Sequence, residues 1–156
     1  MNVEQLDRAI GPCHRLFLDS SALIAYHSPV EPTHPLVKHL LARVERDTDV
    51  LQACYSVLSA TELLVRPIRA GVSEFAFMHS FLTDFPNLRG LPVDLAVATQ
   101  AATIRATTDL KLPDAIIVAT ALLAGCEVIV SNDERWKRRL SPLYRQFTWL
   151  YLADYL

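Results

Sequence analysis

Short apolar segments alternate along the chain with longer segments of helical periodicity, and this alternation constrains the fold more than any other feature. The expected strands span residues 16–18, 50–57, 88–94, 127–133 and 147–152. The expected helices span residues 20–26, 36–47, 59–71, 73–85, 94–110 and 112–126. Pro67 is expected to interrupt the third helix, and Pro92 restricts its strand to an edge of the sheet. Alternating strands and helices predict an α/β fold: a three-layer domain with a mostly parallel central sheet flanked by helices.

The composition narrows the class of protein further. A chain of 156 residues with 51% hydrophobic and 21% charged residues is most simply one globular domain. No apolar run approaches the roughly 20 residues that span a bilayer, and the N-terminus lacks the apolar stretch of a signal peptide. We therefore expect a cytoplasmic protein without membrane contact. A net charge of −2 excludes a broad basic surface for nucleic acid.

Four carboxylates occupy comparable positions in this pattern. Asp19 follows the first strand and Asp133 ends the fourth, while Glu62 and Asp114 lie early in two helices. In a parallel sheet the strand ends and the helix starts share one edge, so all four can face one cleft. Clustered carboxylates repel one another, and a divalent cation would remove that repulsion. Oxygen ligands without an adjacent His or Cys cluster favour Mg²⁺, with Mn²⁺ as the alternative.

Each carboxylate also has an ordinary structural explanation. Asp19 can cap the following helix, and Asp114 suits a first helical turn. Ser59 with Glu62 can form a capping box, as can the segment 131–134. These explanations account for each residue alone but not for the joint pattern.

Four segments, "LFLDSSALIAY", "SATELL", "LPDAIIVATAL" and "VIVSNDERW", resemble in order the acidic motifs of the PIN-domain nucleases. The resemblance runs from Arg15 to the C-terminus, so residues 1–14 are expected to be an N-terminal extension and residues 15–156 a single PIN-like nuclease domain. In its small size, the chain is most similar to the VapC-type toxins of toxin–antitoxin pairs. The resemblance implies the following site residues: Asp19, Glu62, Asp114 and Asp133 as catalytic and metal-binding acids, with Ser131 and Ser20 in support.

The resemblance implies metal-dependent hydrolysis of RNA phosphodiester bonds, leaving a 3′-hydroxyl and a 5′-phosphate. Asp19 and Asp114 would be the main ligands of Mg²⁺, while Glu62 and Asp133 would ligate through water, hold a second ion or steer the attacking water. Lys111, or basic residues of the segment 134–139 such as Arg135 and Lys137, could position the RNA backbone.

The expected partners are RNA, a second copy of the chain and a small antitoxin. Residues 73–85 carry more large apolar side chains than one buried helix face needs, which favours a homodimer through this helix and the preceding one. The antitoxin is expected in a groove between residues 59–71 and 36–47.

Other functions stay open at this point. A PIN-like fold could serve as an RNA- or protein-binding module with little catalysis, or as a housekeeping nuclease without an antitoxin. A phosphoaspartyl phosphatase needs a second acid two residues after the first, where this chain has Ser21. A phospho-accepting receiver domain needs paired acids after the first strand and a lysine after the last, and neither is evident.

Overall fold

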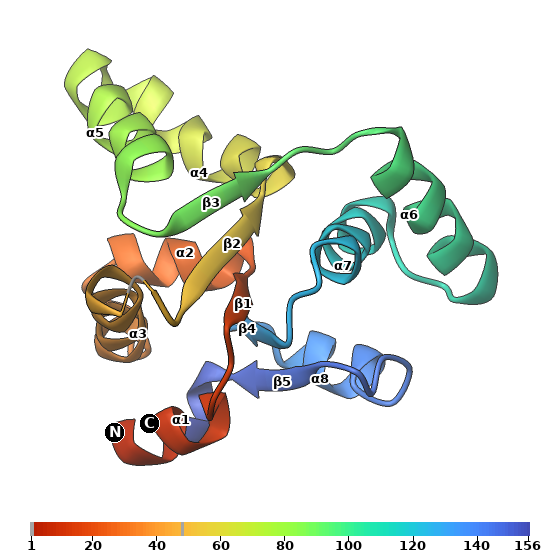
Figure 1. The fold of residues 1–156 in the computed structure, drawn as a ribbon. Coiled ribbons are helices and arrows are strands. Elements are labelled where there is room, and N and C mark those ends of the chain that lie inside the picture. The colour runs from red at the N-terminus through yellow and green to blue at the C-terminus, as the bar shows by residue number, and fades with distance from the viewer. Residues whose placement is uncertain (1, 48) are drawn as a thin grey trace.

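The computed structural model describes residues 2–47 and 49–156 (Figure 1). The strands are β1 (Arg15–Leu18), β2 (Gln52–Ser56), β3 (Leu88–Leu91), β4 (Val128–Ser131) and β5 (Thr148–Tyr151). The helices are α1 (Val3–Ile10), α2 (Ser20–His27), α3 (His34–Arg46), α4 (Val57–Ala70), α5 (Val72–Asp84), α6 (Leu95–Thr107), α7 (Leu112–Leu123), α8 (Glu134–Leu140) and the 3₁₀ turn η1 (Leu152–Tyr155). None of these described helices is long and apolar enough to cross a lipid bilayer.

The five strands form one sheet in the order β3-β2-β1-β4-β5, and every neighbouring pair is parallel. The expected α/β class and parallel sheet are therefore confirmed. β3 lies at an edge, as the proline after it predicts, because a central strand would need the backbone N–H that Pro92 lacks.

Successive side chains of a strand point to opposite faces of the sheet, so the buried core is divided between the two faces. Leu16 and Leu18 of β1 join a cluster that contains buried residues of helices α1 to α5. Phe17, which points to the opposite face, joins a second cluster with residues of α6, α7 and α8. Figure 1 shows these two groups of helices on either side of the sheet, which gives the expected three layers.

Helix α4 differs from the sequence-based expectation at both ends. It begins at Val57, where Ser56 caps it by accepting a hydrogen bond from the backbone N–H of Leu58 (3.2 Å). The capping box expected at Ser59 is therefore wrong, since Ser59 lies inside the helix and is buried. The interruption expected at Pro67 is also wrong, because α4 continues through Pro67 to Ala70, although this proline has no N–H to donate to the carbonyl of Leu63.

The first residues pack against the rest of the chain. Leu6 and Ile10 of α1 are buried, and the carboxylate of Asp7 forms an ion pair with Arg43 (2.8 Å) and lies within hydrogen-bond distance of Nε2 of His39 (3.0 Å), both on α3. The backbone N–H of Asn2 donates to the carbonyl of Tyr155 (2.7 Å), and Figure 1 shows the two chain ends side by side. The division into residues 1–14 and 15–156 stays a prediction, and the structure places α1 in the main core cluster.

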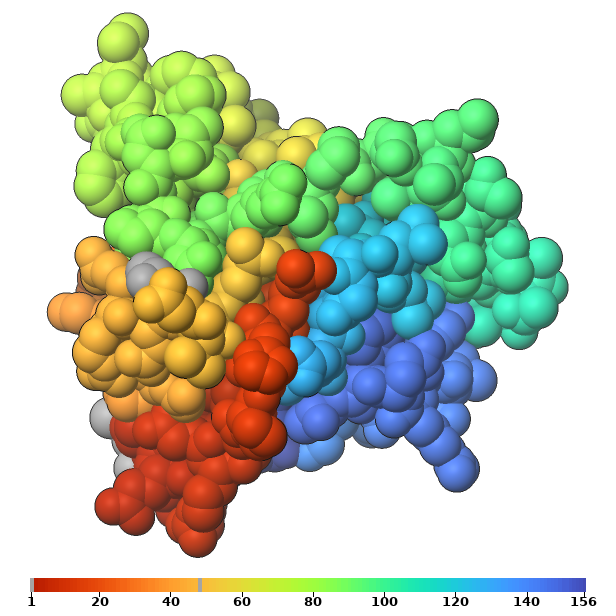
Figure 2. Space-filling model, viewed as in Figure 1, coloured from red at the N-terminus to blue at the C-terminus, as the bar shows by residue number. Residues whose placement is uncertain are grey.

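The hairpin of α4 and α5 projects from the body of the molecule (Figure 2). Met78, Phe81 and Leu82 of α5 are buried, whereas Phe77 is 68% exposed and Val72 is 87% exposed. This end of the hairpin thus presents apolar side chains to solvent.

Candidate active site

The sheet has its topological switch point between β1 and β4. These strands are neighbours, and the chain leaves β1 through α2 on one face and β4 through α8 on the other. A crevice at the carboxyl ends of two such strands is the usual ligand site of a parallel α/β sheet. Asp19 stands at the end of β1, and its backbone N–H donates to the carbonyl of Val130 in β4 (3.2 Å).

Asp19 is buried, with 3% of its surface exposed, and hydrogen bonds hold both of its carboxylate oxygens. Oδ1 accepts from the Ser21 hydroxyl (2.7 Å) and the Ala22 N–H (2.8 Å), and Oδ2 accepts from the Ser131 hydroxyl (2.6 Å). Burial raises the pKa of Asp19 to about 6, although these three hydrogen bonds oppose the rise and the charge of Asp133 adds to it. Asp19 is therefore a helix cap, as one interpretation predicts, and also a desolvated acid at the switch point.

Asp133 and Asp114 lie at the same edge. Asp133 caps α8 and accepts from the backbone N–H of Arg135 (2.9 Å), so the capping box expected at residues 131–134 is wrong. Asp114 sits in the first turn of α7, where burial raises the pKa of its carboxyl, the indole of Trp136 opposes the rise and Asp133 adds to it. The negative charge of Asp133 thus acts on both Asp19 and Asp114.

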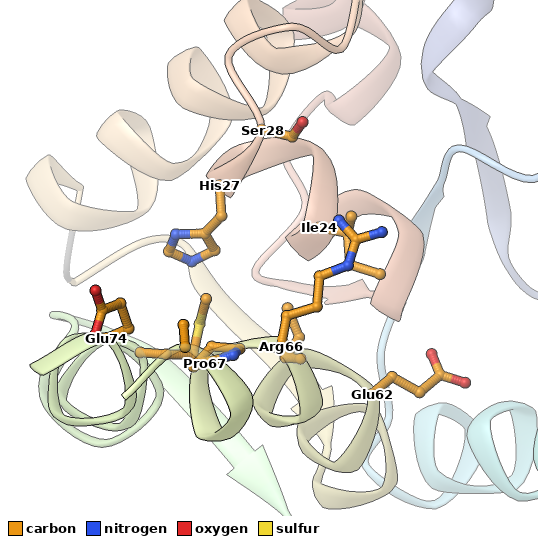
Figure 3. A pocket seen from close by; sticks show the side chains of 10 residues that line it. Ile24, His27, Ser28, Glu62, Arg66, Pro67 and Glu74 are labelled. Carbon is orange, nitrogen blue, oxygen red and sulfur yellow. The ribbon is translucent and has the colours of Figure 1, made fainter. Parts of the chain in front are cut away.

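Glu62 occupies a different environment from the three aspartates. It lies in the second turn of α4, not at the start of the helix, and lines a pocket together with Arg66 (Figure 3). α4 contacts α2, which Asp19 caps, and α7, which carries Asp114. Its membership of the site stays a prediction.

Ser21 contacts the Asp19 carboxylate, and the supporting role expected of Ser20 stays a prediction. The Ser21 hydroxyl donates to Asp19 and accepts from the backbone N–H of Asn132 (2.8 Å), so it links the ends of β1 and β4. Ser131 also contacts Asp19, since its hydroxyl donates to that carboxylate and accepts from the N–H of Asp133 (3.0 Å). The signal for Ser21 was its spacing, because a hydroxyl two residues after a capping aspartate can reach that carboxylate.

A cavity of about 220 Å³ lies between the start of α7 and α8, and we call it the mixed-charge cavity. It is lined by Leu110, Lys111, Asp114, Asp133, Arg135, Trp136 and Arg139. Lys111 and Arg135, which were proposed to contact RNA, line this cavity together with Arg139 of the same basic segment, and the contact with RNA stays a prediction. Lys137 is not among the lining residues: its ammonium pairs with Asp154 and lies 6.0 Å from the ring centre of Tyr151.

The donor chemistry of this edge fits a hard divalent cation. Three carboxylates supply oxygen ligands only. Burial, with the charge of Asp133 added, raises the pKa of Asp19 and of Asp114 and so disfavours their ionisation without a cation, whereas the hydrogen bond from Arg135 lowers the pKa of Asp133. Their side chains are not drawn together around a common point: among residues 2–47 and 49–156, no three acids, histidines or cysteines are placed to hold a metal ion.

The PIN domain family model matches residues 16–139, well over half of the chain, and the chain therefore belongs to the PIN domain family. Several solved structures share the fold. A toxin–antitoxin complex from Klebsiella pneumoniae is 22% identical, with a TM-score of 0.59, covering 76% of this chain and 86% of that one. VapC20 of Mycobacterium tuberculosis, described as a toxin that cleaves the sarcin-ricin loop, is 19% identical, with a TM-score of 0.59 and coverage of 79% and 93%.

VapBC-1 from nontypeable Haemophilus influenzae is 15% identical, with a TM-score of 0.62 and coverage of 89% and 98%. The chain matches no curated protein at a significant level.

Proposed function

We propose that this PIN-domain protein is a Mg²⁺-dependent endoribonuclease and the toxin of a type II toxin–antitoxin pair. The observation that carries the proposal is the buried Asp19 at the switch point, fixed by three hydrogen bonds and, like Asp114, subject to the negative charge of Asp133. Burying a carboxylate lowers the stability of the folded protein, so we infer that the chain keeps Asp19 for its function. An RNA substrate and an antitoxin partner place this activity in the cytoplasm.

The side chains at this edge would have different roles in the reaction. Asp19 and Asp114 would hold Mg²⁺, with Mn²⁺ as a substitute, and Ser131 and Ser21 fix the orientation of the Asp19 carboxylate. When bound, the ion would acidify a water molecule and offset charge on the phosphoryl oxygens. Asp133 and Glu62 would complete the acidic set, as further ligands or by orienting the attacking water.

One observation favours the alternative of a binding module with little catalysis, because the described residues contain no preassembled metal cluster. The two functions differ in their response to Mg²⁺. A nuclease gains thermal stability from Mg²⁺ in the wild type but not in Asp19→Asn, whereas a metal-free binding module gains it in neither.

The antitoxin is proposed to bind the pocket of about 380 Å³ shown in Figure 3. Its walls come from α2, α4 and α5, so α3, which was expected to form one wall of the groove, contributes no lining residue. Ile24, Leu63 and Met78 supply apolar surface, and Arg66 supplies a cation. His27 also lines the pocket, and its Nε2 atom is buried without a hydrogen-bond partner within the described chain.

A homodimer is proposed through the projecting α4–α5 hairpin. Ile68, Val72 and Phe77 are each more than half exposed there, and together they form an apolar surface that a second copy could cover.

Expression in cells tests the toxin assignment. Production of the chain alone should arrest growth, and co-expression of the adjacent small open reading frame should restore it. RNA isolated shortly after induction should contain new 5′-phosphate ends at a small number of positions. Brisk cleavage of RNA by the purified protein without growth arrest would favour a housekeeping nuclease instead.

A further inference from the structure

The mixed-charge cavity combines two acids with three bases. Asp114 and Asp133 line it together with Lys111, Arg135 and Arg139, and its volume exceeds that of a water molecule several-fold. A site for a metal ion alone would need only the acids. A nuclease must also hold the negatively charged backbone of its substrate beside those acids, and cationic side chains in the same cavity can do so.

Arg135 forms a fork-like contact with Asp133. Its Nε lies 3.0 Å from Oδ1 and 3.1 Å from Oδ2, and its Nη2 lies 2.6 Å from Oδ2. A guanidinium binds a carboxylate and a phosphate with the same planar geometry. Because both Asp133 oxygens are engaged by Arg135, the guanidinium competes for this carboxylate with a metal ion that would take it as a direct ligand.

The other two cations are available to a ligand. Arg139 donates to Oδ1 of Asp109 (2.9 Å), but the Asp109 side chain is 95% exposed, and an ion pair in contact with water is weak. Lys111 has no carboxylate within ion-pair distance in the part of the chain that the structure describes.

The neighbouring cations of α8 are arranged differently. Arg138 pairs with Glu134 (3.7 Å), Lys137 pairs with Asp154, and neither lines the cavity. Arg135 and Arg139 of α8 therefore line the cavity, whereas Lys137 and Arg138 of the same helix do not.

We propose that the mixed-charge cavity seats one phosphate of the RNA strand, held by Lys111, Arg139 and Arg135, and that Arg135 reaches this phosphate by leaving Asp133. The inference rests on the proposed ribonuclease function and adds two features to it. One is a defined backbone-binding position beside the acids. The other is an internal exchange, in which the guanidinium occupies Asp133 until metal and RNA arrive.

RNA binding tests the first feature. Anisotropy of a labelled single-stranded RNA is measured in EDTA, where the metal-dependent reaction is off, for Lys111→Ala, Arg139→Ala and the matched control Arg138→Ala. Loss of a charged hydrogen bond to phosphate should weaken binding about tenfold in each cavity variant. The slope of log K against log salt should also fall by about 0.7. The control should stay within about twofold of wild type.

Metal binding in the absence of RNA tests the second feature. The Mg²⁺ concentration that gives half of the maximal rise in Tm is measured for Arg135→Ala and Arg138→Ala, which remove the same charge from the same helix. Removal of the guanidinium frees Asp133 and should lower this Mg²⁺ concentration in Arg135→Ala, but leave it unchanged in the control. The decrease should be only severalfold, because an exposed ion pair is weak and competes only modestly with Mg²⁺.

The outcomes separate this inference from the function on which it rests. If wild type cleaves RNA but the cavity variants bind it as well as Arg138→Ala does, the cavity assignment is wrong and the nuclease function stands. If wild type binds RNA through these residues but Mg²⁺ never produces cleavage, the nuclease function fails and the cavity assignment stands. A wild type that does not bind RNA, or an Arg135→Ala variant with unchanged Mg²⁺ affinity, overturns the inference.

Discussion

Replacing Asp19 by Asn should make the protein more stable at neutral pH, and the structure gives the magnitude. Burial raises the pKa of Asp19 from 3.8 to about 6. Between about pH 4 and pH 6 the folded state therefore binds a proton that the unfolded state has released, so this group's contribution to the free energy of unfolding falls as pH rises through that window. One pKa unit corresponds to about 1.4 kcal/mol, so at pH 7 the ionised carboxylate costs about 3 kcal/mol.

Asparagine avoids this cost and keeps part of the local structure. Its amide oxygen can still accept from the Ala22 N–H and the Ser21 hydroxyl, which preserves the cap of α2. The Ser131 hydroxyl now donates to Oδ2 and would have to accept from the amide nitrogen instead, so part of the gain is lost. We expect a net stabilisation of about 1–3 kcal/mol at pH 7, or several degrees in Tm for a chain of this size.

Urea unfolding followed by circular dichroism at pH 4, 5, 6 and 7 measures the effect. The free energy of unfolding of Asp19→Asn minus that of wild type should be near zero at pH 4 and should grow until about pH 7. The other carboxylates contribute equally to both proteins, so their contributions cancel in this difference. Saturating Mg²⁺ at pH 7 should then stabilise wild type by about 2–3 kcal/mol and leave the variant unchanged. A difference that does not depend on pH would refute the conclusion that Asp19 is desolvated.

Three further substitutions test the packing. Leu6→Ala should lower the free energy of unfolding in urea by about 2–4 kcal/mol, because this α1 side chain is fully buried. A loss below about 0.5 kcal/mol would show that residues 1–14 are dispensable for folding. Phe77→Glu, at a 68% exposed position, should turn a dimer into a monomer in light scattering with little change in Tm, and a wild type that is already monomeric at micromolar concentration contradicts the dimer. Gly90→Ala should cost about 1–3 kcal/mol in the same urea assay, since the added Cβ would lie 2.8 Å from the hydroxyl of buried Tyr55; near-wild-type stability would mean that the ring moves aside freely.

The positions of the strands and of the acids could be read from the sequence because each depends on local pattern. The apolar run 16–18 ends at Asp19, and a parallel sheet then brings that carboxylate to the same edge as the end of β4. Pro92 likewise predicted the edge position of β3, since its missing N–H acts whatever the tertiary context.

Features that depend on side-chain direction could not be predicted in the same way. The two-residue spacing shows only that Ser21 can reach the carboxylate of Asp19, and the geometry of the first helical turn decides that it does so. The basic run 134–139 reads as one charged segment, but the helix divides it, so that Arg135 and Arg139 line the cavity and Arg138 does not. These assignments need the helix phase relative to the sheet, which sequence periodicity over seven residues does not fix.

Cleavage of RNA by purified protein tests the central claim most directly. The measurement is the single-turnover rate of cleavage of a cellular RNA pool by wild type and Asp114→Asn, with Mg²⁺ and with EDTA. We predict that wild type cleaves in Mg²⁺, stops in EDTA and resumes when Mg²⁺ is restored. Asp114→Asn should be slower by about a hundredfold or more. Equal rates in EDTA and Mg²⁺, or full activity of Asp114→Asn, would contradict the assignment of this sheet edge as a metal-dependent nuclease site.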